Sequence, residues 1–169
     1  MANPLYTASI PVFQQMLKAL SGVLRKAEDH ATAKKIDPNA LLQARLYPDM
    51  FALLRQVQIG TDFAKGVSAR LAGVEVPALP DTEQTFADLQ ARITTVLDFI
   101  GGLDASLFDK PDSREIVIQQ GTPRERTFAA NVYLLHYGLP QFFFHITTAY
   151  ALLRHNGIEV GKKDYMGAT

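Results

Sequence analysis

The sequence predicts an all-α protein, a four-helix up-down bundle with a small hairpin or extended excursion before the last helix. Four long stretches repeat apolar residues at three- and four-residue spacing, as helices that bury one face do. Glycine, proline and capping residues bound each stretch. With 169 residues and no internal repeat, the chain is expected to form one domain over residues 1–169.

The first two long helices are expected over residues 10–29 and 47–73, with a short helix over 39–43 between them. Ser9 is a candidate N-cap of the first helix because its hydroxyl can accept from a free amide in the first turn. The Tyr-Pro-Asp sequence at residues 47–49 is expected to begin the second long helix. Asp49 would then lie in the first turn, where a carboxylate stabilises the helix dipole.

The third helix is expected over residues 86–100, after a linker that ends near residue 80. Asp81 and Gln84 resemble a capping box at its start, and two glycines follow its end. A β-branched run at residues 116–118, followed by a glycine and a second polar and apolar stretch, predicts the hairpin or extended excursion.

The fourth helix, over residues 128–156, contains a proline within its apolar pattern. The expected core stripe is Phe128, Val132, Leu135, Leu139, Phe142, Ile146, Ala149 and Leu153. Pro140 lacks an amide hydrogen and would clash with the carbonyl of His136, at a cost of roughly 3 kcal/mol in a helix interior. A kink beside an ionisable ring is therefore predicted in the wall of the bundle. The tail after residue 157 is expected to lie along the bundle surface.

His136 is the first candidate for a functional side chain, because it flanks the stripe and should face a neighbouring helix. One interpretation is a core-edge histidine held by a single hydrogen bond. The other is a site that combines His136, the carbonyl released by Pro140, and one of Asp49, Gln56 or Asp62 from the second helix. Such a site would hold a metal only weakly, through oxygen ligands and water.

Phe143 and His145 are the remaining candidates for residues that line a pocket. Phe143 lies seven residues after His136, and His145 lies on the opposite flank of the same helix. His136 and His145 are about 13 Å apart along the axis and half a turn out of phase, so they cannot share one metal ion. Phe144 and its neighbours predict either a wide core or contact with a second subunit.

The composition excludes several classes of function. Basic and acidic residues both number 17, so no net charge favours nucleic acid or membrane surfaces. The chain has no cysteine, which excludes disulfides, thiolate ligands and a cysteine nucleophile. There is no phosphate-binding glycine loop or serine-nucleophile motif. Without a signal peptide or an apolar run of membrane-spanning length, a cytoplasmic location is expected.

Four segments resemble a known superfamily. The segments are VFQQMLKALSGVLRKAE, RLYPDMFALLRQVQIGTDFAKG, PQFFFHITTAYALLRHNG and GKKDYMG. They are similar to the DinB-like (YfiT-like) superfamily of four-helix-bundle metalloenzymes, in a bacterial branch classed as a domain of unknown function. The resemblance implies homodimers and a divalent metal, often nickel or zinc. Three histidines would hold that metal, one from the second helix and two from an HxxxH on the last.

Mapped onto this chain, the resemblance implies a degenerate metal site. His136 would match the first histidine of the HxxxH, Pro140 would occupy the second position, and Gln56 or Gln58 would replace the histidine of the second helix. The favoured prediction is a degenerate metal site at His136 that serves as a small-molecule pocket or as no site at all, with no cofactor or with weakly bound nickel or zinc. The alternatives are a metal-dependent transferase or hydrolase that uses His136, and a non-catalytic structural homodimer.

Overall fold

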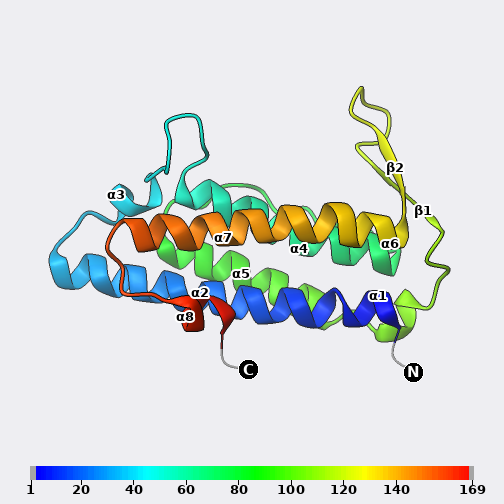
Figure 1. Cartoon of the computed structure of the whole chain (residues 1–169), viewed down its shortest axis with the longest axis horizontal. Helices are drawn as coiled ribbons and strands as arrows, with labels where there is room; N and C mark the ends of the chain where they lie inside the picture. The colour runs from blue at the N-terminus through cyan, green and yellow to red at the C-terminus, as the bar shows by residue number, and fades with distance from the viewer. Residues whose placement is uncertain (1–2, 168–169) are drawn as a thin grey trace.

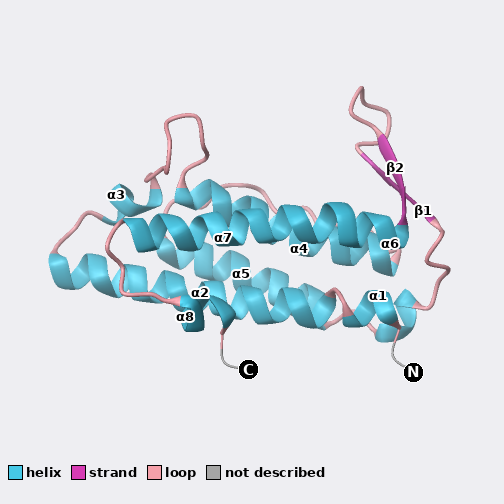
Figure 2. Ribbon diagram, viewed as in Figure 1, coloured by secondary structure: helices cyan, strands magenta, loops and turns pink. Residues whose placement is uncertain are grey.

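The computed structural model describes residues 3–167 and is mostly helical, with one small two-stranded sheet (Figures 1 and 2). Within that range, the α-helices have the following bounds: α1 Pro4–Thr7, α2 Ile10–Lys34, α3 Pro38–Leu42, α4 Leu53–Ala72, α5 Phe86–Gly101, α6 Ala130–Val132, α7 Leu139–His155 and α8 Lys162–Met166. A 3-10 helix, η1, spans Ala105–Phe108, and a π-helix, η2, spans Tyr133–Gly138. No helix among these residues is long and apolar enough to cross a membrane.

The four longest described helices, α2, α4, α5 and α7, lie lengthwise beside one another and enclose one apolar core (Figure 1). Helix α4 packs against both α5 and α7, and α2 packs against α5 and α7. Phe13 of α2 and Phe142 of α7 are fully buried and meet edge to face, with ring centroids 4.8 Å apart. Aromatic pairs in this geometry contribute about 0.5–1.5 kcal/mol beyond the area that they bury.

Local side-chain hydrogen bonds set several helix boundaries. Asp37 accepts from the amide of Asn39 at 3.0 Å and so caps α3, close to the expected short helix. Ser9 precedes α2, but its hydroxyl donates to the carbonyl of Leu5 instead of capping the helix. The capping box of α5 forms between Thr85 and Asp88, not between Asp81 and Gln84. Asp81 forms ion pairs instead, as described below.

The second long helix begins six residues later than predicted. Helix α4 starts at Leu53, and residues 43–52 form a loop that projects from the body of the molecule (Figure 2). Asp49 is exposed in this loop, so the prediction that it stabilises the first turn of the helix is wrong. The apolar spacing cannot reveal this boundary, because Met50 continues the stripe in sequence although the backbone there is not helical.

The predicted kink at Pro140 is absorbed by the π-helical turn η2. The amide of Leu139 donates to the carbonyl of Leu134, five residues back, which is the hydrogen bond that defines a π turn. Pro140 then lies in the first turn of α7, where its missing amide hydrogen costs little. A π turn contains one residue more than an α turn. The positions that face the core before this turn are therefore shifted by about one residue relative to the predicted stripe. Val132 and Leu135 are consequently 40% and 52% exposed, and their assignment to the core is wrong.

The residues that replace them in the core are Tyr133, Leu134 and Gly138, all of which are buried. Gly138 is required by close packing against α4, because a Cβ there would lie 2.8 Å from a methyl carbon of Val67. C-terminal to the π turn the predicted stripe is confirmed, since Phe142, Ile146, Ala149 and Leu153 are buried.

The excursion before the last helix is a hairpin. Strand β1, Glu115–Ile118, pairs antiparallel with β2, Arg126–Ala129, and the hairpin projects from the end of the molecule where the N-terminus lies (Figure 1). Ile116 and Ile118 point into the core. The C-terminal tail runs back along α2, where Gln15 donates to the carbonyl of Met166 at 2.8 Å.

Candidate functional site

The helices α4 and α7 bring Gln56 and His145 into direct contact. His145 Nδ1 lies 2.7 Å from Gln56 Oε1, and both residues are buried. Gln56 Nε2 donates to the carbonyl of Phe51 at 3.1 Å, so its Oε1 is the atom left to accept from His145. The proton of the neutral ring therefore sits on Nδ1, and Nε2 carries the lone pair.

Small and aromatic residues surround this pair. Gly60 lets α4 approach α7, because a Cβ there would lie 2.7 Å from Ile146 Cδ1 and 3.7 Å from His145 Cβ. The Phe63 ring stacks on His145 with centroids 6.0 Å apart, and Phe144 meets the same ring edge-on at 5.1 Å. The imidazole is thus held by one hydrogen bond, by the stacked Phe63 ring and by the edge-on contact with Phe144.

Burial, with a smaller contribution from the charge of Arg55, lowers the pKa of His145 from 6.5 to about 4. The ring is therefore neutral at pH 7. Within residues 3–167, the buried side-chain nitrogen and oxygen atoms without a partner are Ser68 Oγ and Arg114 Nη1. His145 Nε2 has no hydrogen bond to a described residue, so this nitrogen must reach solvent. The result is a neutral acceptor at the surface of a largely buried ring.

This pKa predicts a specific pH dependence of stability. Since His145 titrates near 6.5 unfolded and near 4 folded, the unfolded chain binds more protons between those values, and stability falls as pH drops from 6.5 to 4. The loss is on the order of 1–3 kcal/mol. Urea unfolding of the wild type at pH 7 and pH 4.5 should show it, and His145→Gln should show a smaller difference. Equal pH dependence in the two proteins would contradict the assignment.

His136, the first candidate from the sequence, does not meet Gln56. His136 and Pro140 are both exposed, so the prediction that His136 faces a neighbouring helix is wrong. The cause is again the π turn, which rotates the residues before Leu139 relative to the rest of α7. The pairing of Gln56 with a histidine of the last helix is present, but the histidine is His145.

The contact with α4 also changes where the HxxxH of the superfamily would fall. Helix α7 is regular from Leu139 to His155, so Gln141 and His145, four residues apart, lie on one face. The frame that packs near Gln56 is therefore Gln141-x-x-x-His145, in place of His136-x-x-x-Pro140. On this alignment one histidine and two glutamines stand where the resemblance implies three histidines.

The donor set does not fit a three-histidine metal centre. Among the described residues there is no group of three or more His, Cys, Asp or Glu side chains that could hold a metal ion. Gln56 Oε1 binds the Nδ1 side of His145, so it orients the ring and is not placed as a second ligand beside Nε2.

Asp62, another candidate from the sequence, belongs to an ion-pair network around Arg92. Arg92 is almost completely buried, and its Nη2 lies 2.8 Å from Asp62 and 3.0 Å from Asp81. Its Nη1 lies 2.9 Å from Glu83, and its Nε donates to Thr61 at 2.7 Å. We call Arg92, Asp62, Asp81 and Glu83 the Arg92 network. It ties the 74–85 linker to α4 and α5, so Asp62 has a structural role here.

The remaining sequence candidates are separate from the His145 site. Asp49 lies in the exposed loop, and Phe143 is half-buried against Phe142, with ring centroids 5.5 Å apart. Phe144, expected to meet a second subunit or fill a wide core, is 55% exposed in the single chain.

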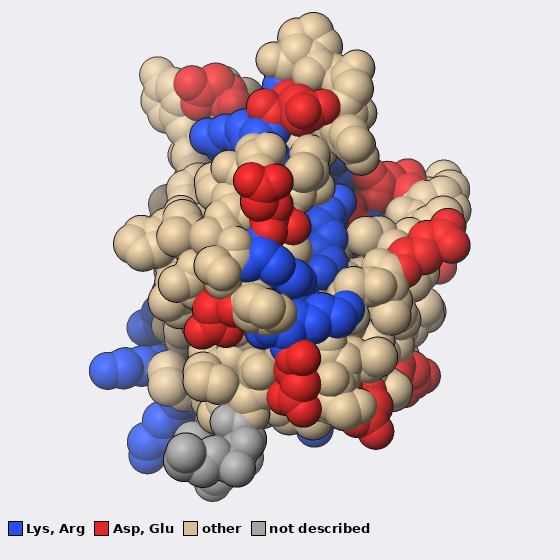
Figure 3. Space-filling model, turned by 90° about the vertical axis from the view of Figure 1, so that its right-hand side faces the viewer, with Lys and Arg blue, Asp and Glu red and all other residues tan. Residues whose placement is uncertain are grey.

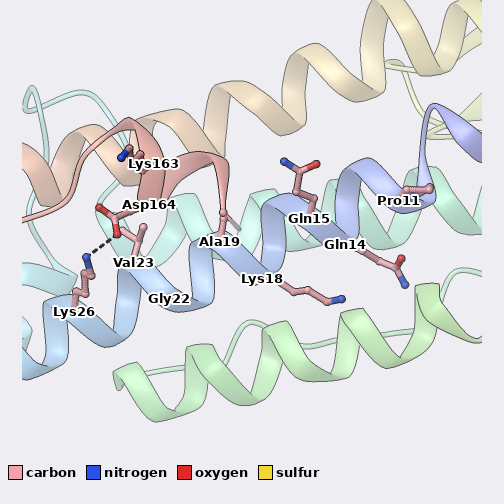
Figure 4. Close-up of a pocket in the computed structure, with 11 residues that line it drawn as sticks. Pro11, Gln14, Gln15, Lys18, Ala19, Gly22, Val23, Lys26, Lys163 and Asp164 are labelled. Atoms are coloured by element: carbon pink, nitrogen blue, oxygen red, sulfur yellow. Dashed lines mark hydrogen bonds and ion pairs between the residues drawn. The ribbon is translucent and has the colours of Figure 1, made fainter. Parts of the chain in front are cut away.

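An open groove of about 660 Å³ runs along α2 and α8 (Figure 4). Lys26 and Asp164 form an ion pair of 2.6 Å at one end of it, and Lys18 and Gly22 lie along its floor and edge. Its lysine side chains are exposed and Asp164 is half-buried, so the groove contains no fully buried titratable group and its chemistry favours no reaction.

The sequence interpretation missed Arg92, although a signal was present. Arg92 lies three residues after Leu89 and four before Val96, so it falls beside the apolar stripe of α5. A charged residue on a core-facing helix side indicates a buried ion pair. Arg70, Tyr133 and Gln119, which line a second cavity discussed below, carried no comparable signal, because the hairpin brings them together only in three dimensions.

The fold and this site define a class, a mostly helical protein with a histidine–glutamine pair between two long helices. The family model described as "Domain of unknown function (DUF1993)" matches residues 5–166, and the chain belongs to this family. A solved structure of a DinB family member protein from Shewanella denitrificans is similar, at 41% identity and a TM-score of 0.91. The match covers 98% of this chain and 93% of that chain. No curated protein matches the sequence.

Proposed function

We propose that the protein is a DinB-like up-down four-helix bundle that binds a small neutral organic molecule beside His145. The observation that carries this proposal is the orientation of the ring. Gln56 holds Nδ1, so Nε2 is a solvent-facing acceptor that stays unprotonated at pH 7. A ligand with an O–H or N–H donor would complete the hydrogen bonding of the ring.

The surroundings suit an apolar ligand body. The exposed ring of Phe144 borders His145, and exposed aromatic side chains at Tyr47 and Phe51 lie in the loop that Gln56 anchors. Binding sites commonly combine such apolar surface with one or two fixed polar groups. The binding of Gln56 to the carbonyl of Phe51 couples the loop to the histidine.

Phenol and toluene provide a test, since they differ mainly in the donor. The ¹H and ¹³C resonances of the His145 ring should shift on titration with phenol, with about tenfold weaker binding of toluene. The response should be lost in Gln56→Leu, because the ring proton is then no longer held on Nδ1. It should be kept in Gln120→Leu, which replaces an exposed glutamine in the turn of the hairpin. Equal responses to phenol and toluene would overturn the proposal.

The alternative function is a metal-dependent transferase or hydrolase, now with His145 as the ligand. The membership in a family with a DinB neighbour and the available lone pair of Nε2 favour it. A full equivalent of tightly bound nickel or zinc, lost in His145→Ala, would support this alternative and reject the neutral-ligand proposal. The homodimer expected from the sequence stays a prediction, and Leu135 and Phe144 are the exposed apolar side chains that it would cover.

A further inference from the structure

A second cavity, of about 160 Å³, lies between α4, η2 and the hairpin. Phe63 separates it from the His145 site, because this ring stacks on His145 and also meets Tyr137 edge-on, with centroids 5.9 Å apart. The apolar walls are formed by Phe63, Val67, Ile118, Tyr133 and Tyr137. An engineered apolar protein cavity of about 150 Å³ accepts benzene, so this cavity has room for one aromatic ring.

One side of the cavity carries a cation without a carboxylate partner. Arg70, in the last turn of α4, is half-buried, and none of the ion pairs within residues 3–167 includes it. Its Nη1 donates to the hydroxyl oxygen of Tyr133 at 3.4 Å. A guanidinium has five donors in a plane, so most of the donors of Arg70 remain available to a planar anion.

Tyr133 adds a second donor beside Arg70. Burial raises the pKa of Tyr133, so its phenol keeps its proton at neutral pH. Its oxygen accepts from Arg70, and its hydrogen can therefore be donated to a ligand. A carboxylate would receive hydrogen bonds from both residues, and hydrogen bonds to a charged acceptor are the stronger kind.

The one acidic residue that lines the cavity does not oppose an anion. Asp62 Oδ1 already lies 3.1 Å from Lys65 and 2.8 Å from Arg92, so its charge is compensated. Basic side chains gather in a hollow at this end of the molecule (Figure 3). Lys110 and Arg114 contribute to the positive charge near Arg70, since they donate to the last carbonyls of α4.

The hairpin places a strained residue at the same cavity. Gln119, directly after β1, has φ of 51° and lines the opening. A left-handed backbone is unfavourable for a side chain without special support, and such strain clusters at ligand-binding positions. Together with the unpaired arginine, this conformation points to a ligand that the hairpin covers.

We propose that this cavity binds a small aromatic carboxylate, with its ring against Phe63 and Tyr137 and its carboxylate on Arg70 and Tyr133. The three aromatic walls favour a flat ring over a branched aliphatic chain. Arg70 is the one basic residue among the residues that line the cavity, so it balances the single charge of a carboxylate, whereas a phosphate dianion would leave excess charge inside the largely apolar cavity. This binding activity is separate from the proposed neutral ligand at His145.

Benzoate and benzamide are suitable probes, because they share size and shape and differ in charge. Calorimetry should detect benzoate binding that is at least about tenfold tighter than benzamide binding. Arg70→Met should weaken benzoate binding about tenfold or more, and Arg25→Met, an exposed arginine on α2, should leave it unchanged. Equal binding of the two probes, or no benzoate binding by the wild type, would overturn the proposal.

Further measurements show whether a variant has lost the cavity site or has unfolded, and whether benzoate binds at this cavity or at the His145 site. Thermal melting establishes whether Arg70→Met remains folded, and Tyr133→Phe, which keeps the ring, should still weaken benzoate binding several-fold. His145→Ala should leave benzoate binding intact, and Arg70→Met should leave the phenol response of His145 intact. Benzoate binding that disappears in His145→Ala but survives Arg70→Met would reject the cavity and assign the anion to the His145 site.

Discussion

Replacing Arg92 with methionine should destabilise the protein by about 3–5 kcal/mol, because it removes a buried cation and leaves the largely buried carboxylate of Glu83 without one. Arg92 donates four hydrogen bonds, to Thr61, the carbonyl of Pro80, Glu83 and Asp62, and it forms an additional ion pair with Asp81. For a chain of this size the loss corresponds to a melting temperature lower by roughly 6–20 °C.

The carboxylates left behind account for the size of this effect. Burial alone would raise the pKa of Glu83, but hydrogen bonds from Arg92 and Gln58 hold that pKa below its usual range. Glu83 is thus charged at pH 7 beside Asp62 and Asp81. Without Arg92, Asp62 would keep Lys65 and Asp81 would keep Arg55, whereas Glu83 would keep only the hydrogen bond from Gln58 and would lie beside two other carboxylates.

Two control variants separate this effect from a general loss of charge. Arg25→Met removes an exposed arginine from α2 and should change stability by less than about 0.5 kcal/mol. Arg92→Lys keeps the charge but not the planar fork, so its stability should lie between those of the wild type and Arg92→Met. A melting temperature of Arg92→Met within a degree or two of the wild type would show that the network contributes little.

The parts of the fold that follow from local pattern could be predicted from the sequence. The stripe from Phe142 to Leu153 and the hairpin were predicted and are present. Val132 and Leu135 were misplaced because a π turn shifts the helical phase, and spacing alone cannot reveal an extra residue in a turn. The presence of Pro140 indicated an irregularity but not the form that it takes.

The site was harder to predict, because it depends on which helix faces meet. Gln56 and Asp62 were candidates for a site with His136, and Gln58 was a candidate for a replaced metal ligand, yet all three bind other residues. Gln56 binds His145 on α7, whereas Gln58 donates to Glu83 at 2.7 Å and Asp62 pairs with Arg92. Polar residues of one helix thus bind partners on two sides of it. A one-dimensional pattern does not show which partner each residue has.

The second large effect is expected from rebuilding a three-histidine set in the frame that the structure indicates. The double variant Gln56→His/Gln141→His places two further imidazoles near His145, from α4 and from the preceding turn of α7. Replacing Gln56 removes the hydrogen bond to His145 Nδ1, so this nitrogen, which faces residue 56, becomes free to bind the metal. Zinc binding by calorimetry should be at least about a hundredfold tighter than in the wild type, since three imidazoles form a standard zinc site. A saturating metal should also raise the melting temperature, because it binds only the folded chain.

The matched comparison is Pro140→His, which creates an HxxxH with His136 on the exposed side of the last helix. Both positions are exposed and neither is near Gln56 in the described contacts, so this variant should gain little zinc affinity beyond that of an isolated surface pair. The two variants place histidines in different frames of the same helix, and the frame that packs on α4 should bind metal far more tightly. Stronger zinc binding by Pro140→His than by the double variant would contradict this alignment. It would indicate that His136, and not His145, corresponds to the metal ligand that the resemblance implies.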